Sequence, residues 1–109
     1  MAYVEKYAVD APGRAEIDAL PGFALLEFGT NWCGHCQAAQ AAIATALNAL
    51  PDLRHIKVED GAGRPLGRSY RVKLWPTLIF LKDGQEVERL IRPRAAEEVA
   101  SVLRRLAGA

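Results

Sequence analysis

The 109-residue sequence predicts a single α/β domain, a three-layer sandwich whose mixed, mainly parallel central sheet has one antiparallel hairpin and helices on both faces. Two continuous apolar runs, residues 23–28 and 78–81, have the length and composition of strands that are buried on both faces. Between and after these runs, apolar residues recur with the spacing of a buried helix face. A chain of this length can bury one hydrophobic core, so we assign residues 1–109 to one domain.

The first part of the chain predicts two strands and a short helix. Aromatic and β-branched side chains in residues 3–9 favour a strand, and residues 14–20 favour a helix between two Pro-Gly breaks. Residues 23–28, FALLEF, form the first buried strand, in which Glu27 is the one charged side chain. Since burial disfavours a charged carboxylate, we expect Glu27 to have a raised pKa and to exchange a proton near neutral pH.

The middle of the chain predicts a long helix, a strand and a short helix. Residues 33–50 are rich in Ala, Leu and Gln, and Pro51 ends this helix. Its apolar stripe includes Cys36, which we therefore expect to face the sheet. Residues 55–58 favour a strand, and residues 66–70 a short helix that follows a glycine-rich loop.

The end of the chain predicts a hairpin and a helix. After the buried strand at residues 78–81, Asp83-Gly84 supplies the positive φ angles of a tight turn, so residues 87–91 return antiparallel. The last helix has acidic side chains in its first turn and basic ones in its last turn, which matches the helix dipole. The predicted order is β-α-β-α-β-α-β-β-α.

Charge and hydropathy exclude several functional classes. The 14 basic and 13 acidic residues leave a net charge of +1, without the basic stripe or patch that binds nucleic acid or a membrane surface. No apolar run reaches the ~18 residues of a membrane span, and the N-terminus lacks the apolar core of a signal peptide. We therefore expect a cytoplasmic monomer that binds neither nucleic acid nor membrane.

Both cysteines lie in the motif Trp32-Cys33-Gly34-His35-Cys36, at the predicted start of the long helix. Free N–H groups and the positive dipole end at a helix N-terminus stabilise a thiolate, so Cys33 is the candidate nucleophile. Cys36, one turn later, can resolve a mixed disulfide. Two alternatives are a zinc site, for which two Cys and two His are a sparse ligand set, and a permanent disulfide closing a very small loop. We expect neither a metal nor an organic cofactor.

The segments FALLEFGTNWCGHC and WPTLIFLKDG together resemble the thioredoxin superfamily. The resemblance extends over residues 3–106, and the CGHC motif is of the protein-disulfide-isomerase type. It implies a thioredoxin-like fold and a thiol-disulfide oxidoreductase, in which Trp32, Gly34 and His35 support the cysteine pair.

The resemblance also implies a proton-handling pair. Glu27 matches the buried acid that lies beneath the second cysteine in this family, and Lys57 matches the lysine near that acid. Glu27 would then remove the proton from Cys36 when a mixed disulfide is resolved. A contact with Lys57 that only stabilises the buried carboxylate is the alternative, and the two interpretations are compatible.

A further implied element is a substrate-binding segment at Trp75-Pro76-Thr77. Pro76 matches the cis-proline that faces the active-site disulfide, and the backbone of Trp75 would pair with the substrate chain. A trans proline at the start of a strand is the alternative. Trp75 is larger than the usual residue at this position, so it narrows the substrate groove, stacks on a partner, or packs on Trp32.

The chain departs from the thioredoxin pattern in two other places. His35 replaces the usual proline and, by stabilising the Cys33 thiolate, would favour oxidase or isomerase behaviour. The segment Arg92-Pro93-Arg94, with two charged side chains, stands where thioredoxins carry a glycine against the substrate, which puts their usual partners in doubt. His55 opens a strand, and we expect it to be solvated.

The sequence therefore favours an enzyme that exchanges disulfides with protein substrates through Cys33 and Cys36, acting as a reductase. Its electron donor would be a dithiol system such as thioredoxin reductase or glutathione. One alternative is a non-enzymatic binding module or assembly chaperone that keeps the fold for its groove. A glutaredoxin is a third possibility, although those proteins usually carry Pro-Tyr between the cysteines.

Overall fold

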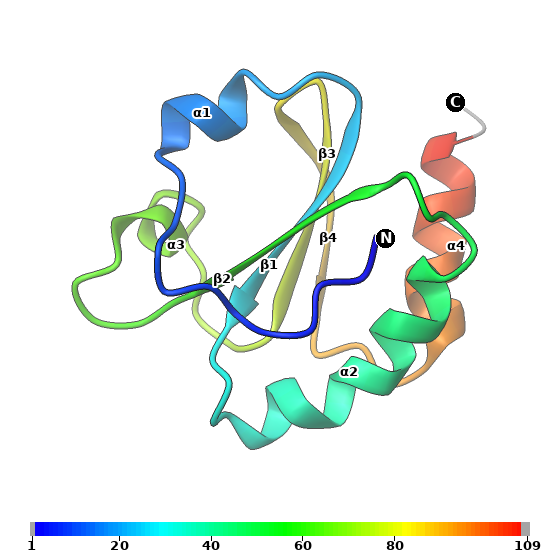
Figure 1. Ribbon diagram of the computed structural model, residues 1–109, viewed down its shortest axis with the longest axis horizontal. Helices are drawn as coiled ribbons and strands as arrows, with labels where there is room; N and C mark the ends of the chain where they lie inside the picture. Colours follow the sequence, from blue (N-terminus) through cyan, green and yellow to red (C-terminus); the bar gives the residue numbers. More distant parts are fainter. Residues whose placement is uncertain (1, 108–109) are drawn as a thin grey trace.

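The computed structural model describes residues 2–107. It contains four strands and four helices, which alternate along the chain until a final hairpin and helix (Figure 1). In chain order they are α1 (Arg14–Asp18), β1 (Phe23–Gly29), α2 (Gly34–Leu47), β2 (Arg54–Glu59), α3 (Pro65–Ser69), β3 (Thr77–Lys82), β4 (Gln85–Ile91) and α4 (Ala96–Ala107).

The strands form one mixed sheet in the order β2-β1-β3-β4. β1 and β2 are parallel, whereas β3 is antiparallel to both β1 and β4. The prediction of a mainly parallel sheet is therefore wrong. A parallel β3 would need a crossover that returns the chain to the opposite end of the sheet. The short helix α3 does not provide that length, so β3 begins at the same end of the sheet at which β2 ends.

The predicted strand at residues 3–9 is also wrong, because this segment makes a single parallel bridge between Ala8 and Val58. Side chains bind several of its other backbone groups. The N–H of Val4 donates to Nδ1 of His55 at 2.9 Å, and the N–H of Tyr7 donates to Oδ1 of Asn31 at 2.9 Å. The segment runs alongside β2, at the edge of the sheet, as an extended strap (Figure 1).

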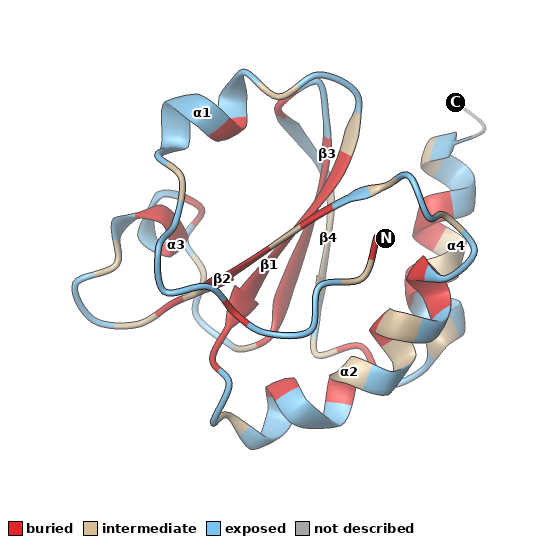
Figure 2. Ribbon diagram, viewed as in Figure 1, coloured by how far each residue is buried: buried red, intermediate tan, exposed pale blue. Residues whose placement is uncertain are grey.

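Helices cover both faces of the sheet, which confirms the three-layer arrangement. On one face, α2 and α4 pack on Leu25, Leu78 and Phe80, and on the other, α1 and α3 pack on alternate residues of the same strands. Buried residues follow the strands and the inner sides of the helices (Figure 2). No helix within residues 2–107 is both long and apolar enough to cross a membrane.

Local sequence determines where two elements end. Asp83 and Gly84 have φ angles of 48° and 80°, as the predicted tight turn between β3 and β4 requires. The first turn of α4 contains Glu97 and Glu98 and its last turn contains Arg104 and Arg105, so these charges interact favourably with the helix dipole, as predicted.

Candidate active site

The two cysteines lie at the start of α2, where it meets the end of β1 (Figure 1). Cys33 is the N-cap, and its Sγ accepts a hydrogen bond from the N–H of Cys36 at 3.3 Å. Both are free thiols; Cys33 is half-buried and Cys36 has no exposed surface. Within residues 2–107, no three His, Cys, Asp or Glu side chains gather as a metal site. A disulfide in solution can therefore reach Cys33 but not Cys36.

The environment of Cys36 keeps its thiol protonated. Burial, reinforced by a hydrogen bond with Cys33, raises the pKa of Cys36 to about 12. Hydrogen bonds with the Thr30 backbone and the Tyr7 hydroxyl act in the opposite direction. At neutral pH Cys36 needs a proton acceptor before it can attack a disulfide.

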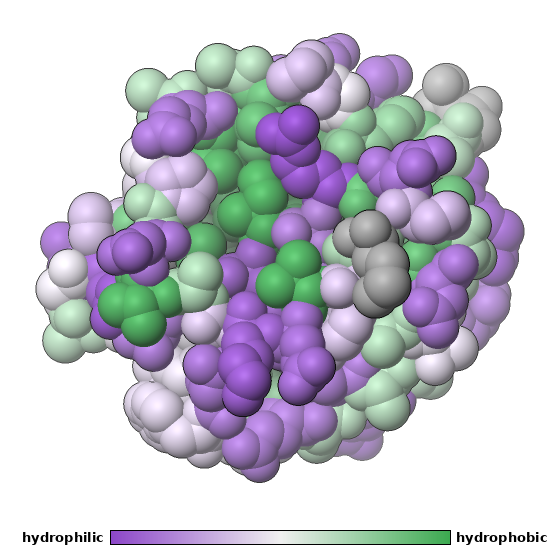
Figure 3. All heavy atoms as spheres, in the orientation of Figure 1, coloured by the Kyte–Doolittle hydropathy of each residue, from purple (hydrophilic) through white to green (hydrophobic). Residues whose placement is uncertain are grey.

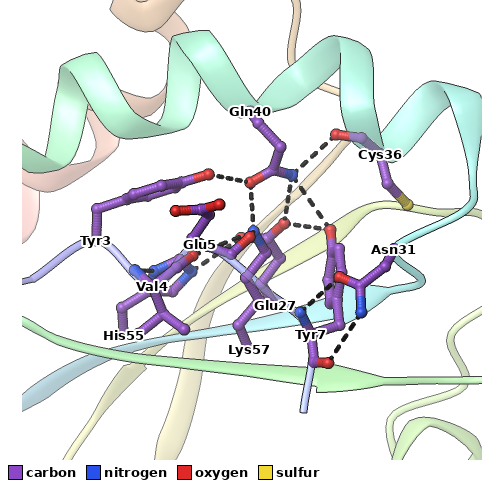
Figure 4. A network of polar contacts seen from close by, with 10 residues as sticks. All are labelled: Tyr3, Val4, Glu5, Tyr7, Glu27, Asn31, Cys36, Gln40, His55 and Lys57. Carbon is purple, nitrogen blue, oxygen red and sulfur yellow. Dashed lines mark hydrogen bonds and ion pairs between the residues drawn. The ribbon is translucent and has the colours of Figure 1, made fainter. Parts of the chain in front are cut away.

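Glu27 of β1 is the centre of a buried polar network next to Cys36 (Figure 4). Its Oε2 accepts hydrogen bonds from the Tyr7 hydroxyl and from Nε2 of Gln40, the latter at 3.0 Å. Its Oε1 lies 2.8 Å from Nε2 of His55 on β2. Donors from the N-terminal segment, from α2 and from β2 thus meet on one carboxylate.

His55 is a buried partner of Glu27, so the prediction that it is solvated is wrong. Its Nδ1 accepts a hydrogen bond from the N–H of Val4 at 2.9 Å. Because Nδ1 accepts this hydrogen bond, Nε2 is the ring nitrogen whose N–H faces Glu27. His55 therefore stabilises the carboxylate as a hydrogen-bond donor.

The predicted raised pKa of Glu27 is also wrong. Burial raises this pKa, but the hydrogen bond and the charge of His55, the charge of Lys57 and the hydrogen bond from Tyr7 outweigh burial and lower it below its ordinary value. The apolar pattern of β1 does not reveal these donors, which come from other segments. At neutral pH Glu27 is therefore a carboxylate, which can accept a proton.

Lys57 lies opposite Glu27 across the parallel strands, but its ammonium group binds elsewhere. Nζ donates to Oε1 of Gln40 at 2.5 Å and to the carbonyls of Val4 and Glu5 at 3.1 and 2.6 Å. Burial lowers the pKa of Lys57, and the charge of Glu27 opposes that shift. The expected Glu27–Lys57 contact is thus replaced by one that runs through Gln40.

The predicted substrate-binding segment lies beside the cysteines. The Trp75–Pro76 peptide bond is cis, as the resemblance implies, and Pro76 and Thr77 are buried. Nε1 of Trp75 donates to Oδ2 of Asp60 at 2.9 Å. The Trp75 ring meets Trp32 edge-on with 5.9 Å between centroids, which confirms the packing alternative.

Arg92 occupies the backbone that a substrate chain was expected to use. Its Nε donates to the carbonyl of Trp75 at 2.8 Å, and its N–H donates to the carbonyl of Pro76 at 3.0 Å. A substrate strand that pairs with the Trp75 carbonyl therefore has to displace this guanidinium or share the oxygen with it.

The residues next to Cys33 in the motif are exposed at the surface of the protein. Trp32 is 72% exposed, and Gly34 and His35 are also exposed. Hydrophilic side chains gather over the lower centre of the face in Figure 3. An indole and an imidazole ring are thus exposed next to Cys33, where a partner can contact them.

The three residues that bind the Glu27 carboxylate directly are missing from the predicted site: Tyr7, Gln40 and His55. Two of them had a signal in the sequence. His55 is two residues before Lys57 in one strand, so both side chains share a face of the sheet with Glu27. Gln40 follows Cys36 by four residues, so both lie on one side of α2. Tyr7 had no such signal, because its place depends on the path of the N-terminal segment.

Comparison with known proteins places this geometry in a family. The Thioredoxin family model matches residues 10–105. The structure of thioredoxin 2 from Pseudomonas aeruginosa PAO1 in its reduced form is 52% identical, with a TM-score of 0.86, and the match covers 95% of this chain and 96% of that one.

Two curated relatives are longer than this chain. Thioredoxin-2 of Pyricularia oryzae is 32% identical over 69 residues, which are 63% of this chain and 40% of that protein. Protein disulfide-isomerase A3 of Gallus gallus is 34% identical over 102 residues, which are 91% of this chain and 20% of that protein. The chain thus spans less than half the length of these two relatives. With the family match over most of its length, the chain belongs to the thioredoxin family.

Proposed function

We propose that this protein is a thiol-disulfide oxidoreductase that reduces disulfides in other proteins. The observation that carries the proposal is the unequal pair of thiols: Cys33 is accessible at a helix N-terminus, and Cys36 is buried beside a carboxylate. Family membership supports the same chemistry. Such a pair can separate the attack on a substrate from the release of the product.

The reaction proceeds in two exchanges. The Cys33 thiolate attacks one sulfur of the client disulfide, forms a mixed disulfide, and releases the first client thiolate. Cys36 then loses its proton to the network around Glu27 and attacks Sγ of Cys33. The bond from Cys33 to the client breaks as the Cys33–Cys36 disulfide forms. Two electrons pass to the client, and a dithiol donor afterwards reduces the protein again.

The location, the oligomeric state and the electron donor of the protein are also proposals. We place the protein in the cytoplasm as a monomer, with a thioredoxin-reductase-like enzyme or glutathione as the donor. A reducing compartment favours net reduction of clients. His35 acts against this direction, because a cationic or donating ring beside Cys33 stabilises the reduced pair.

A second candidate is a non-enzymatic binding module. The bond between Arg92 and the Trp75 carbonyl favours it, because it obstructs the groove where a client backbone would pair. The intact Cys36–Glu27 environment argues against it, since binding alone needs no buried proton acceptor.

Reduction of a protein disulfide separates these two functions. The protein, a dithiol donor and a model protein disulfide are mixed, and thiol release is followed with and without the protein. We expect acceleration by the wild type and none by the Cys33→Ser/Cys36→Ser double variant. Wild type that is as inactive as the double variant with every dithiol donor would overturn the enzymatic proposal.

The surface beside Cys33 suggests which clients are favoured. A groove next to α2 is lined by His35, Ala38, Ala39, Arg92, Pro93 and Arg94. It contains no carboxylate, and neither arginine forms an ion pair within residues 2–107. Charge complementarity therefore favours clients with acidic side chains next to the disulfide.

Arg94→Glu is expected to lower kcat/KM for a disulfide peptide flanked by Glu by about tenfold at low salt, and to raise it for one flanked by Lys. Arg94 is suitable because it is exposed, whereas Arg92 also binds the Trp75 carbonyl. Arg54→Glu at the start of β2, away from the cysteines, makes the same change in net charge and serves as the control. Equal effects of Arg94→Glu on both peptides would exclude this preference.

A further inference from the structure

Tyr7 is the member of the buried network whose hydroxyl lies near both the Glu27 carboxylate and the Cys36 thiol, whereas Gln40 binds Glu27 and the Cys36 carbonyl. Its main chain is held by Asn31, which accepts from the Tyr7 N–H at 2.9 Å and donates to the Tyr7 carbonyl at 3.3 Å. The ring is buried, and its hydroxyl points toward Glu27 and α2 (Figure 4). The hydroxyl is thus fixed between two elements that carry the reacting groups.

Gly29 allows the Tyr7 hydroxyl and the Cys36 thiol to approach one another. A Cβ atom on Gly29 would lie 2.6 Å from Sγ of Cys36 and 2.7 Å from Oη of Tyr7. Both atoms therefore occupy the space directly over the Gly29 backbone, where any larger residue would place a methyl group. The missing side chain brings the two polar atoms together.

The hydrogen bond of the Tyr7 hydroxyl also determines the direction in which a proton can move. A tyrosine hydroxyl has one proton, and that of Tyr7 is donated to Oε2 of Glu27. Toward Cys36 the same oxygen can then only accept, and the Cys36 thiol has a proton to give. The donors run from Cys36 to Tyr7 to Glu27, and Glu27 is a carboxylate at neutral pH.

We propose that the Tyr7 hydroxyl relays the proton between the Cys36 thiol and the Glu27 carboxylate. The inference rests on the proposed function, because it describes the second exchange of the same cysteine pair. The Cys36 S–H bond breaks as its proton passes to Oη of Tyr7, and the Tyr7 proton passes to Oε2 of Glu27. In the same step Cys36 attacks Sγ of Cys33, the bond from Cys33 to the client breaks, and the client sulfur leaves as a thiolate. When a donor reduces the protein, the proton returns by the same path as Cys36 leaves.

The surrounding charges suit a relay. Nζ of Lys57 lies 4.6 Å from the centroid of the Tyr7 ring, and Nε2 of His55 lies 2.8 Å from the other oxygen of Glu27. Burial and the charge of Glu27 raise the pKa of Tyr7, so the hydroxyl stays protonated and passes a proton on without becoming a tyrosinate. After the transfer, its O–H can donate to the Cys36 thiolate.

The proposal is tested by Tyr7→Phe in stopped-flow reaction of the reduced protein with an aromatic disulfide that releases a coloured thiolate. The first burst reports attack by Cys33, and the second reports attack by Cys36 on the resulting mixed disulfide. We expect Tyr7→Phe to slow the second burst on the order of 10²-fold at pH 7 and to leave the first unchanged. Tyr70→Phe removes a buried hydroxyl that has no hydrogen-bond partner within residues 2–107, so it is the matched control.

A pH profile separates a relay from a structural effect. The Tyr7 hydroxyl lowers the pKa of Cys36, so removing it raises that pKa further above 7. The second burst of Tyr7→Phe should therefore climb with pH by about tenfold per unit, as free thiolate becomes available, whereas the wild type should change less steeply. A solvent deuterium effect on the second burst of the wild type should be lost in the variant.

The outcomes distinguish the two proposals. If both bursts occur but Tyr7→Phe and the wild type share one second-burst rate and pH profile, the relay is wrong and the oxidoreductase remains. If the wild type gives no second burst, the proposed function itself fails. Should Tyr7→Phe not fold, absence of a deuterium effect in the wild type would still overturn the relay.

Discussion

Cys33→Ser is expected to abolish disulfide reduction, by at least about 10³-fold, and Cys36→Ser is expected to stop it one step later. Without Cys33 the accessible nucleophile is lost, and the buried Cys36 thiol cannot replace it because its pKa is raised to about 12. Without Cys36 the first exchange still occurs, but the client stays attached to Cys33. The two single variants should therefore fail in different ways.

Mass spectrometry of each variant after mixing with a disulfide peptide measures this difference. Cys36→Ser should accumulate the peptide adduct and Cys33→Ser should not. Adducts on Cys36 in the Cys33→Ser variant, formed as fast as those on Cys33, would show that the assigned roles are reversed. Equal reduction rates in all variants would show that neither thiol takes part.

Gly29→Ala is expected to destabilise the protein by about 2–3 kcal/mol and to slow the second exchange. The new methyl group would meet Sγ of Cys36 at 2.6 Å and the Tyr7 ring and hydroxyl at 2.7 Å. Neither neighbour can move away easily, since Cys36 is held in α2 and the Tyr7 main chain is held by Asn31. The steric conflict therefore affects both the core and the site.

Urea unfolding of Gly29→Ala and Gly34→Ala, followed by circular dichroism, tests this expectation. A Cβ on Gly34 has no atom within 4 Å, so Gly34→Ala should stay within about 0.5 kcal/mol of the wild type. If Gly29→Ala were as stable as Gly34→Ala and kept its rate of resolution, the close packing of Tyr7 on Cys36 would be contradicted.

The fold was largely predictable because apolar spacing reports burial. The runs that became β1 and β3 are buried on both faces, and the helical stripe in α2 includes Cys36, as the sequence predicts. The direction of β3 was not predictable from spacing, since a parallel and an antiparallel strand buried on both faces have the same apolar pattern. The strand predicted at residues 3–9 was wrong for a related reason: His55 and Asn31, which are distant in sequence, bind the backbone of this segment.

The active site was likewise predictable only in part. Cys33 and Cys36 were predictable because two thiols and a helix start are adjacent in sequence. The charge state of Glu27 was not, because it depends on donors from three separate segments that only the fold brings together. The residues next to Glu27 in the sequence predict that it is buried. Its pKa depends in addition on residues that are distant in sequence and close in the fold.

The reduction potential of the Cys33–Cys36 pair tests the central claim most directly. The protein is equilibrated with a series of ratios of reduced to oxidised glutathione, and the fraction of disulfide is measured after acid quenching. For a reductase the account predicts a potential close to that of thioredoxin itself, about −270 mV. A potential near about −180 mV, as in protein disulfide isomerase, would contradict net reduction of clients, and a pair that forms no disulfide at any ratio would contradict the redox function altogether.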